Sequence, residues 1–204
     1  MSDNKEPVYF YMDPDDNKIK NLEYIISKFG YPSIVAEIGC YYGKTTCKLV
    51  HKIAPRNPKL IYYAIDSFDT SIDVGEDLEE VYQIFIRNLN SYPYKDNIIF
   101  LREKSFDALV KLRNNKVSPQ LIYIDGDHTA GTVLSDIVLS FDILAPGGVI
   151  ICDDSVVWKY KDKNGIEDPQ MSPRMAVESF IMCNWSKIEP ISLPVGHQTA
   201  FIKK

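Results

Sequence analysis

The sequence lacks the features that mark secreted, membrane-bound or nucleic-acid-binding proteins. Its four cysteines form no C-x-x-C pair, so we expect reduced thiols and neither a disulfide framework nor a zinc site. No apolar run approaches the roughly 18 residues that a membrane helix needs, and the first residues do not resemble a secretory signal. Lys and Arg number 23 against 28 Asp and Glu, which disfavours phosphate-backbone binding. We therefore expect a soluble, cytoplasmic protein with no nucleic-acid or membrane partner.

The length and composition favour one globular domain. A chain of 204 residues with 45% hydrophobic residues can bury a sizeable core without disulfides or metals. No internal repeat or low-complexity tract divides it. We expect a short N-terminal tail at residues 1–16, followed by one domain over residues 17–204.

Short apolar runs alternate with helical patterns along the chain. Strands are predicted at residues 34–36, 60–65, 98–101, 121–124 and 149–152, with two more near 187–193 and 198–203. Helices are predicted at residues 17–29, 79–90, 106–114 and 131–144, with another after the first glycine loop and one opening at Ser172-Pro173. This alternation predicts an α/β fold, a doubly wound and mostly parallel sheet with helices on both faces.

Acidic residues sit at the ends of the predicted strands, where open α/β sheets bind ligands. The set consists of Glu37, Asp66, Asp125, Asp153 and Asp154. Because the carboxyl ends of parallel strands share one edge of a sheet, we expect these acids to converge on one crevice.

The first predicted strand leads into the segment E-I-G-C-Y-Y-G-K-T-T, residues 37–46. A dinucleotide-binding turn would read G-x-G-x-x-G, but here Tyr41 stands where its middle glycine would be, which disfavours NAD. Asp66 follows the next strand, the position at which nucleoside-binding sheets place an acceptor for ribose hydroxyls. A ligand with a ribose and a carboxylate but no pyrophosphate fits S-adenosylmethionine. The simpler interpretations are that Gly39 and Gly43 only shape a turn and that Asp66 caps a helix or faces solvent.

With these motifs, the sequence resembles the class I S-adenosylmethionine-dependent methyltransferases, above all the metal-dependent O-methyltransferases of the catechol and macrocin types. The resemblance runs from about residue 17 to the end, through E-I-G-C-Y-Y-G-K-T-T, A-I-D, I-D-G-D-H, L-A-P-G-G-V-I-I-C-D-D and A-V-E-S-F. It implies a Rossmann-like, seven-stranded sheet whose last strand is antiparallel. It also implies a cofactor site made by Glu37, Gly39, Tyr41, Gly43, Thr45, Asp66, Ser67, Ser105, Phe106 and Asp125.

Within that site, the resemblance places Gly39, Tyr41 and Thr45 near the methionine part, Asp66 on the ribose, and Ser105-Phe106 beside the adenine. Lys104 departs from the family pattern, in which a small or acidic residue is commoner before the serine.

Three carboxylates predict a cation at the crevice. Asp125, Asp153 and Asp154 would repel one another without one, and oxygen ligands suit Mg²⁺, Ca²⁺ or Mn²⁺ better than zinc. The separation of 28 residues between Asp125 and Asp153 is the one that metal-dependent O-methyltransferases show. Cys152 should point to the opposite face from Asp153. The alternative is a metal-free relative, in which Asp125 holds only the cofactor's amine.

His128 is the predicted general base, because imidazole can accept a proton near neutral pH. In catechol-type enzymes a lysine stands at this offset, and an ordinary loop histidine is the alternative. His51 and His197 are interpreted as structural or surface residues. The segment 155–171, with Trp158 and Tyr160, is a better candidate for a substrate cover than the acidic segment 66–80.

The sequence thus predicts a methyltransferase that acts on a hydroxyl oxygen of a small molecule or sugar, with S-adenosylmethionine as cofactor and with assistance from a divalent cation, Mg²⁺. The alternatives are a metal-independent methyltransferase, an inactive cofactor-binding or interaction module and, less favoured, a dehydrogenase. The acceptor and the oligomeric state are left open.

Overall fold

A computed structural model describes residues 17–69, 77–156, 161 and 164–204. The predicted tail at residues 1–16 and the two aromatic residues Trp158 and Tyr160 lie outside the described residues. The helices are α1 (Asn17–Phe29), α2 (Lys44–Ile53), α3 (Leu78–Asn90), α4 (Ser105–Asn114), α5 (Ala130–Ile143) and α6 (Pro173–Asn184). The strands are β1 (Ile34–Ile38), β2 (Ile61–Ile65), β3 (Ile98–Leu101), β4 (Leu121–Ile124), β5 (Val149–Cys152), β6 (Ile188–Ile191) and β7 (Thr199–Lys203). Short 3-10 turns lie at Lys95–Asn97, Pro169–Met171 and Trp185–Lys187.

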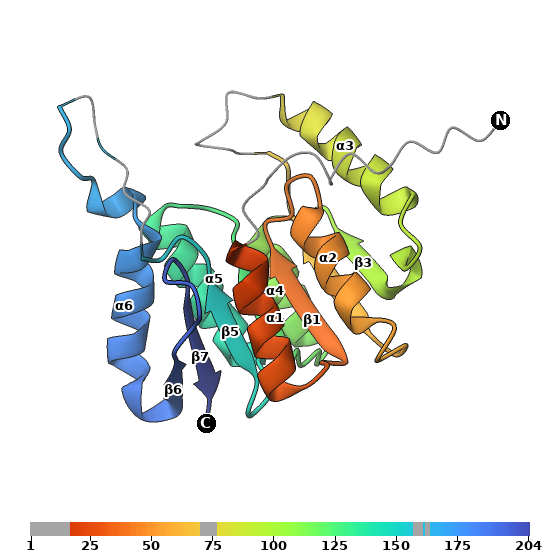
Figure 1. Ribbon diagram of the computed structural model, residues 1–204. Helices are drawn as coiled ribbons and strands as arrows, with labels where there is room; N and C mark the ends of the chain where they lie inside the picture. The colour runs from red at the N-terminus through yellow and green to blue at the C-terminus, as the bar shows by residue number, and fades with distance from the viewer. Residues whose placement is uncertain (1–16, 70–76, 157–160, 162–163) are drawn as a thin grey trace.

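The strands form one sheet in the order β3-β2-β1-β4-β5-β7-β6 (Figure 1). The first five strands pair in parallel, and β7 runs antiparallel to both of its neighbours. Since β1 has β2 on one side and β4 on the other, the strand order reverses at this point. A crevice is therefore expected between the carboxyl ends of β1 and β4. The predicted fold class is confirmed.

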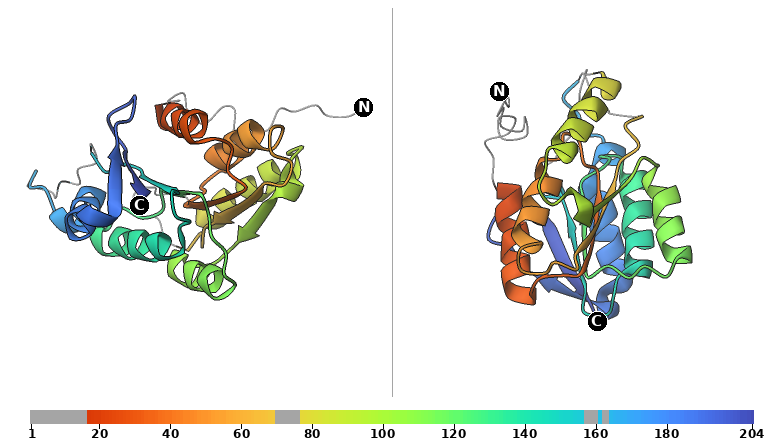
Figure 2. Two further views of the ribbon diagram at one scale, coloured as in Figure 1. Left: turned by 90° about the horizontal axis from the view of Figure 1, so that it is seen from below. Right: turned by 90° about the vertical axis from the view of Figure 1, so that its right-hand side faces the viewer.

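Two layers of helices cover the sheet (Figure 2). Helices α1, α2 and α3 pack on one face, and α4, α5 and α6 pack on the other. Alternate residues of one strand belong to different layers: Tyr123 of β4 packs with α1 and α2, whereas Ile122 packs with α4 and α5. Burial on both faces explains why these strands read as continuous apolar runs in the sequence.

The structure differs from the predicted elements mainly at their ends. Strand β1 continues to Ile38, so Glu37 lies inside the strand and not beyond it. Helix α4 begins at Ser105 itself, Lys104 occupies the capping position, and no side chain caps the helix. Ser172 does precede α6 with Pro173 at its first position, as predicted, although the serine side chain makes no capping hydrogen bond.

Two expectations from composition can be compared with the described residues. None of the helices there has the length and apolarity required to cross a bilayer. All four cysteines are described and are free thiols, and only Cys183 is exposed.

Candidate active site at the carboxyl edge of the sheet

The glycine loop after β1 is held tightly against the loop after β4. Gly39 has a φ of 85°, and a Cβ atom there would lie 2.1 Å from the backbone oxygen of Asp125. Its N–H donates to the carbonyl of Ile65 at 2.9 Å. Gly43 (φ 82°) and Tyr41 (φ 49°) also have positive φ angles, so the chain turns sharply into α2. Gly39 is therefore required for close backbone approach at the centre of the crevice.

Asp66 joins the loops that follow β1 and β2. One carboxylate oxygen, Oδ2, accepts hydrogen bonds from the backbone N–H groups of Cys40 (2.8 Å) and Tyr41 (3.2 Å). The other oxygen, Oδ1, accepts from the N–H of Phe68 at 2.9 Å. A carboxylate has about four lone pairs, so it can hold both loops and still accept a ribose hydroxyl.

Glu37 lies beneath the glycine loop, in the core. Its side chain is fully buried, and its Oε2 accepts hydrogen bonds from the hydroxyls of Thr46 (2.5 Å) and Tyr62 (3.0 Å). Oε1 has no hydrogen-bond partner. Burial raises the pKa of Glu37 to about 8, although the two hydroxyls oppose the rise. The carboxyl group is therefore mostly protonated at neutral pH and supports the loop from below.

Stability should depend on the proton of Glu37. The unfolded chain releases this proton near the ordinary pKa of 4.5, whereas the folded chain keeps it up to about pH 8. Between these values the unfolded state binds fewer protons than the folded state. The free energy of unfolding should therefore fall by about 1.4 kcal/mol for each unit by which the pH rises. Glu37→Gln, which mimics the protonated acid, should remove this slope. Urea unfolding of both proteins between about pH 5 and pH 8 measures it, and parallel pH profiles would contradict the buried proton.

The three acids predicted to bind a cation do converge, and we call Asp125, Asp153 and Asp154 the acid cluster. The structure places the ammonium group of Lys18, from the first turn of α1, among them. Its Nζ lies 2.5 Å from Asp153 Oδ2, 3.4 Å from Asp125 Oδ2 and 3.7 Å from Asp154 Oδ2. The chain thus brings a positive charge of its own to the acid cluster.

Asp153 is the most buried member of the acid cluster, with a side chain only 1% exposed. Its Oδ2 accepts a hydrogen bond from the hydroxyl of Tyr123 at 2.8 Å, and its Oδ1 accepts from Nε2 of Gln198 at 2.9 Å. The same Tyr123 hydroxyl lies 2.9 Å from Asp125 Oδ2. Cys152 is buried in the opposite layer of the core, as the strand alternation predicted.

His128 lies beside the acid cluster and is partly exposed. Its Nε2 is 3.3 Å from Asp154 Oδ2, and each side chain is 18% exposed. Ligand atoms of Asp125, His128 and Asp154 all lie within 4.8 Å of one another. Oxygen and imidazole donors at such separations match the chemistry of Mg²⁺ or Mn²⁺. This set fits a divalent ion, and of the three predicted metal ligands it includes Asp125 and Asp154 but not Asp153.

Burial and neighbouring charges shift the pKa values of Asp125 and Asp154 in opposite directions. Burial and the neighbouring carboxylate of Asp153 raise the pKa of Asp125 well above its usual range, while Lys18 opposes them. Burial also acts to raise the pKa of Asp154, but His128 and Lys18 outweigh it and the net pKa is lowered. Burial alone would lower the pKa of Lys18, and the three carboxylates raise it overall. Lys18 therefore carries its charge at any ordinary pH.

The other predicted cofactor residues line the same edge with different exposures. Tyr41 is 42% exposed and Phe106 is 55% exposed, so both rings present a surface beside the crevice. Thr45, Ser67 and Ser105 are half-buried. Their places are compatible with the predicted cofactor site, and their roles stay predictions.

Lys18 was not among the residues that the sequence indicated. His197, interpreted as a structural or surface residue, has a side chain 14% exposed, and its Nε2 lies 3.9 Å from Asp153 Oδ1. One signal for Lys18 was present, because Asn21 interrupts the apolar stripe of α1 one turn later. Asn21 is fully buried and bonds Gln198 and the backbone of Val195. A buried polar residue in an amphipathic helix indicates that its face meets a polar site.

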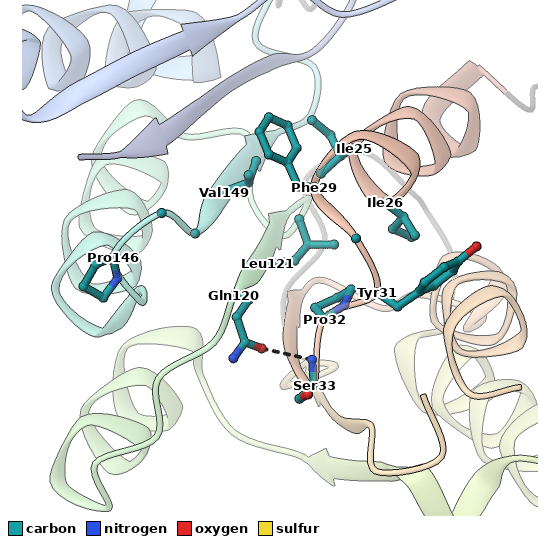
Figure 3. Close-up of a pocket in the computed structure, with 13 residues that line it drawn as sticks. Ile25, Ile26, Phe29, Tyr31, Pro32, Ser33, Gln120, Leu121, Pro146 and Val149 are labelled. Atoms are coloured by element: carbon teal, nitrogen blue, oxygen red, sulfur yellow. Dashed lines mark hydrogen bonds between the residues drawn. The ribbon is translucent and has the colours of Figure 1, made fainter. Parts of the chain in front are cut away.

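A separate cleft of about 310 Å³ lies at the amino ends of the strands, away from the acid cluster (Figure 3). Phe29, Leu121 and Val149 line it, and Gln120 closes one side by accepting hydrogen bonds from the N–H groups of Ser33 and Ile34. It contains none of the predicted site residues.

The fold of the chain is shared with solved methyltransferase structures. A family described as a methyltransferase domain matches residues 36–155, more than half of the chain, and the chain belongs to this family. Comparison with curated proteins finds no match.

Solved structures share this fold at low sequence identity. The chain is similar to an O-methyltransferase from Bacillus cereus in complex with SAH, with a TM-score of 0.67 and 18% identity over 95% of this chain and 82% of the other. It is also similar to a calicheamicin methyltransferase, with a TM-score of 0.60 and 13% identity over 92% and 78% of the two chains.

Proposed function

We propose that this methyltransferase transfers the methyl group of S-adenosylmethionine to a hydroxyl oxygen of a small molecule or sugar. The observation that carries the proposal is the convergence of Asp66, the acid cluster and His128 at one edge of the sheet. The O-methyltransferase title of the Bacillus cereus structure supports the choice of oxygen as acceptor atom.

The residues divide into a cofactor side and an acceptor side. On the cofactor side, Asp66 would accept the ribose hydroxyls, and the glycine loop would hold the methionine part against its backbone N–H groups. On the acceptor side, His128 would take the proton of the hydroxyl group, with Asp154 orienting its imidazole. The rigid backbone contact at Gly39 fixes the separation of the two sides, and methyl transfer depends on such positioning.

Asp125 and Asp154 would hold a divalent ion, Mg²⁺ being our proposal, with Asp153 beside them as a further carboxylate. When bound, the ion would supply a Lewis acid that lowers the pKa of the acceptor hydroxyl. The second candidate is a metal-independent methyltransferase, and a specific observation favours it: the Lys18 ammonium already compensates the same carboxylates.

Calorimetric titration of Mg²⁺ into protein that holds S-adenosylhomocysteine separates the two candidates. We expect a saturable heat in the wild type and its loss in Asp154→Ala. Removal of metal with EDTA should then lower transfer of a labelled methyl group to a panel of catechols and sugars, and added Mg²⁺ should restore it. Equal heats in the wild type and the variant would remove the ion from the proposal.

A further inference from the structure

We infer that Lys18 is a built-in competitor for the divalent ion, so that the ammonium group and the ion occupy the acid cluster in turn. This inference rests on the proposed function and concerns its metal site. It assigns to α1 a role in setting metal affinity.

A network of hydrogen bonds holds the start of α1, and with it the backbone of Lys18, beside the acid cluster. Asn21 lies one turn further along α1, on the same face. Its side-chain amide donates to Gln198 Oε1 at 2.8 Å, and Gln198 donates in turn to Asp153 Oδ1 at 2.9 Å. The Asn21 side chain also makes two hydrogen bonds with the backbone of Val195. The start of α1 is thereby tied to the β6–β7 loop and to the acid cluster itself.

The acid cluster requires a cation in every state. Asp153 is almost completely buried, and Tyr123 and Gln198 fix its two oxygens, so this carboxylate cannot turn to solvent. A buried carboxylate without a positive partner is strongly destabilising. When no metal is bound, Lys18 supplies that partner at 2.5 Å.

The same geometry excludes simultaneous occupation. The ammonium group contacts an oxygen of each acid in the cluster, within 3.7 Å. A divalent ion bound by Asp125 and Asp154 would lie at about 2.0–2.6 Å from their oxygens. The ammonium group lies 3.4 Å and 3.7 Å from Oδ2 of these two acids, so it would stand beside the ion under strong repulsion. Lys18 can leave, because its side chain is 32% exposed and its stem is long and flexible. Metal binding must therefore displace Lys18, and the work of displacement weakens the apparent affinity.

Lys18→Met tests the inference, since methionine keeps an unbranched stem and removes the charge. Lys20→Met is the matched control, because Lys20 is exposed on the same helix and its ammonium group donates to Asn17 Oδ1 at 3.1 Å. Calorimetric titration with Mn²⁺ should show affinity that rises at least about tenfold in Lys18→Met. The Lys20 variant should match the wild type. Asp153→Asn added to Lys18→Met should reduce the binding again.

Thermal unfolding supplies a second readout. In EDTA, Lys18→Met should melt below the wild type because its acid cluster has no cation, and Mn²⁺ should raise its melting temperature more than that of the wild type. Lys18→Gln repeats the measurement if the methionine variant folds poorly. The affinity for S-adenosylhomocysteine should be equal in the wild type, Lys18→Met and Lys18→Gln.

The outcomes separate this inference from the proposed function. Equal Mn²⁺ affinity in the wild type and Lys18→Met would overturn the inference and leave the proposed metal in place. No Mn²⁺ binding to either protein, with S-adenosylhomocysteine bound by both, would overturn both the inference and the metal. If the wild type did not bind S-adenosylhomocysteine, the proposed function itself would be overturned.

Discussion

Replacing His128 with alanine is expected to slow methyl transfer by about 10²–10⁴-fold, the usual contribution of a general base. The imidazole lies beside Asp154 and is 18% exposed, so an acceptor hydroxyl can reach it. The variant should still bind S-adenosylhomocysteine with wild-type affinity, because the proposed cofactor contacts come from the glycine loop and Asp66 and do not include His128. Single-turnover kinetics with labelled cofactor measures the loss.

Two controls separate proton transfer from a structural effect. His51→Ala removes a histidine of α2 whose ring lies near that of Tyr94. The rate of methyl transfer by this variant should equal that of the wild type. Added imidazole should restore part of the activity of His128→Ala if a missing base is the cause. Unchanged turnover in His128→Ala would leave the metal or Lys18 as the activator and refute the assigned role.

Gly39→Ala is expected to produce the largest loss of stability, about 3–5 kcal/mol. The added Cβ would lie 2.1 Å from the carbonyl oxygen of Asp125, and both partners are backbone, so neither can rotate away. Relief requires the loops after β1 and β4 to separate. The same separation should abolish S-adenosylhomocysteine binding, since it moves the two sides of the crevice apart.

Gly30→Ala is the matched control for Gly39→Ala. Gly30 has a φ of 93° at the end of α1, but nothing lies within 4 Å of its Cβ position. Gly30→Ala should lower the free energy of unfolding by only about 1–2 kcal/mol, the cost of placing alanine in the left-handed conformation. Cofactor binding should be preserved. Urea unfolding of the two variants gives the comparison, and equal losses would show that the contact with Asp125 does not restrain the crevice.

The parallel strands were predictable because burial on both faces imposes a simple pattern. Strands β3, β4 and β5 coincide with the predicted runs, since polar or glycine-containing segments bound each of them. Helix starts were less accurate. Ser105 has the composition of a capping residue, yet the chain becomes helical at Ser105 itself. Capping propensity is a local signal, and helix ends are defined only to within one or two residues.

The acidic half of the site was predictable, and its positive half was not. Asp125 and the Asp153-Asp154 pair follow neighbouring strands, so the topology alone brings them together. Lys18 is 107 residues from Asp125 in the sequence, and a lysine in the first turn of an amphipathic helix is ordinarily solvated. The proximity of His197 to Asp153 was not predictable either, because it depends on the conformation of the β6–β7 loop.

Calorimetric titration of S-adenosylhomocysteine into the metal-free protein tests the central claim most directly. Asp66→Ala is the variant, and Asp142→Ala, which removes an exposed carboxylate from α5, is the control. We predict micromolar binding of S-adenosylhomocysteine to the wild type and to Asp142→Ala, and loss of binding in Asp66→Ala. A folded wild type that binds no S-adenosylhomocysteine would contradict the account, because the crevice would then not be a cofactor site.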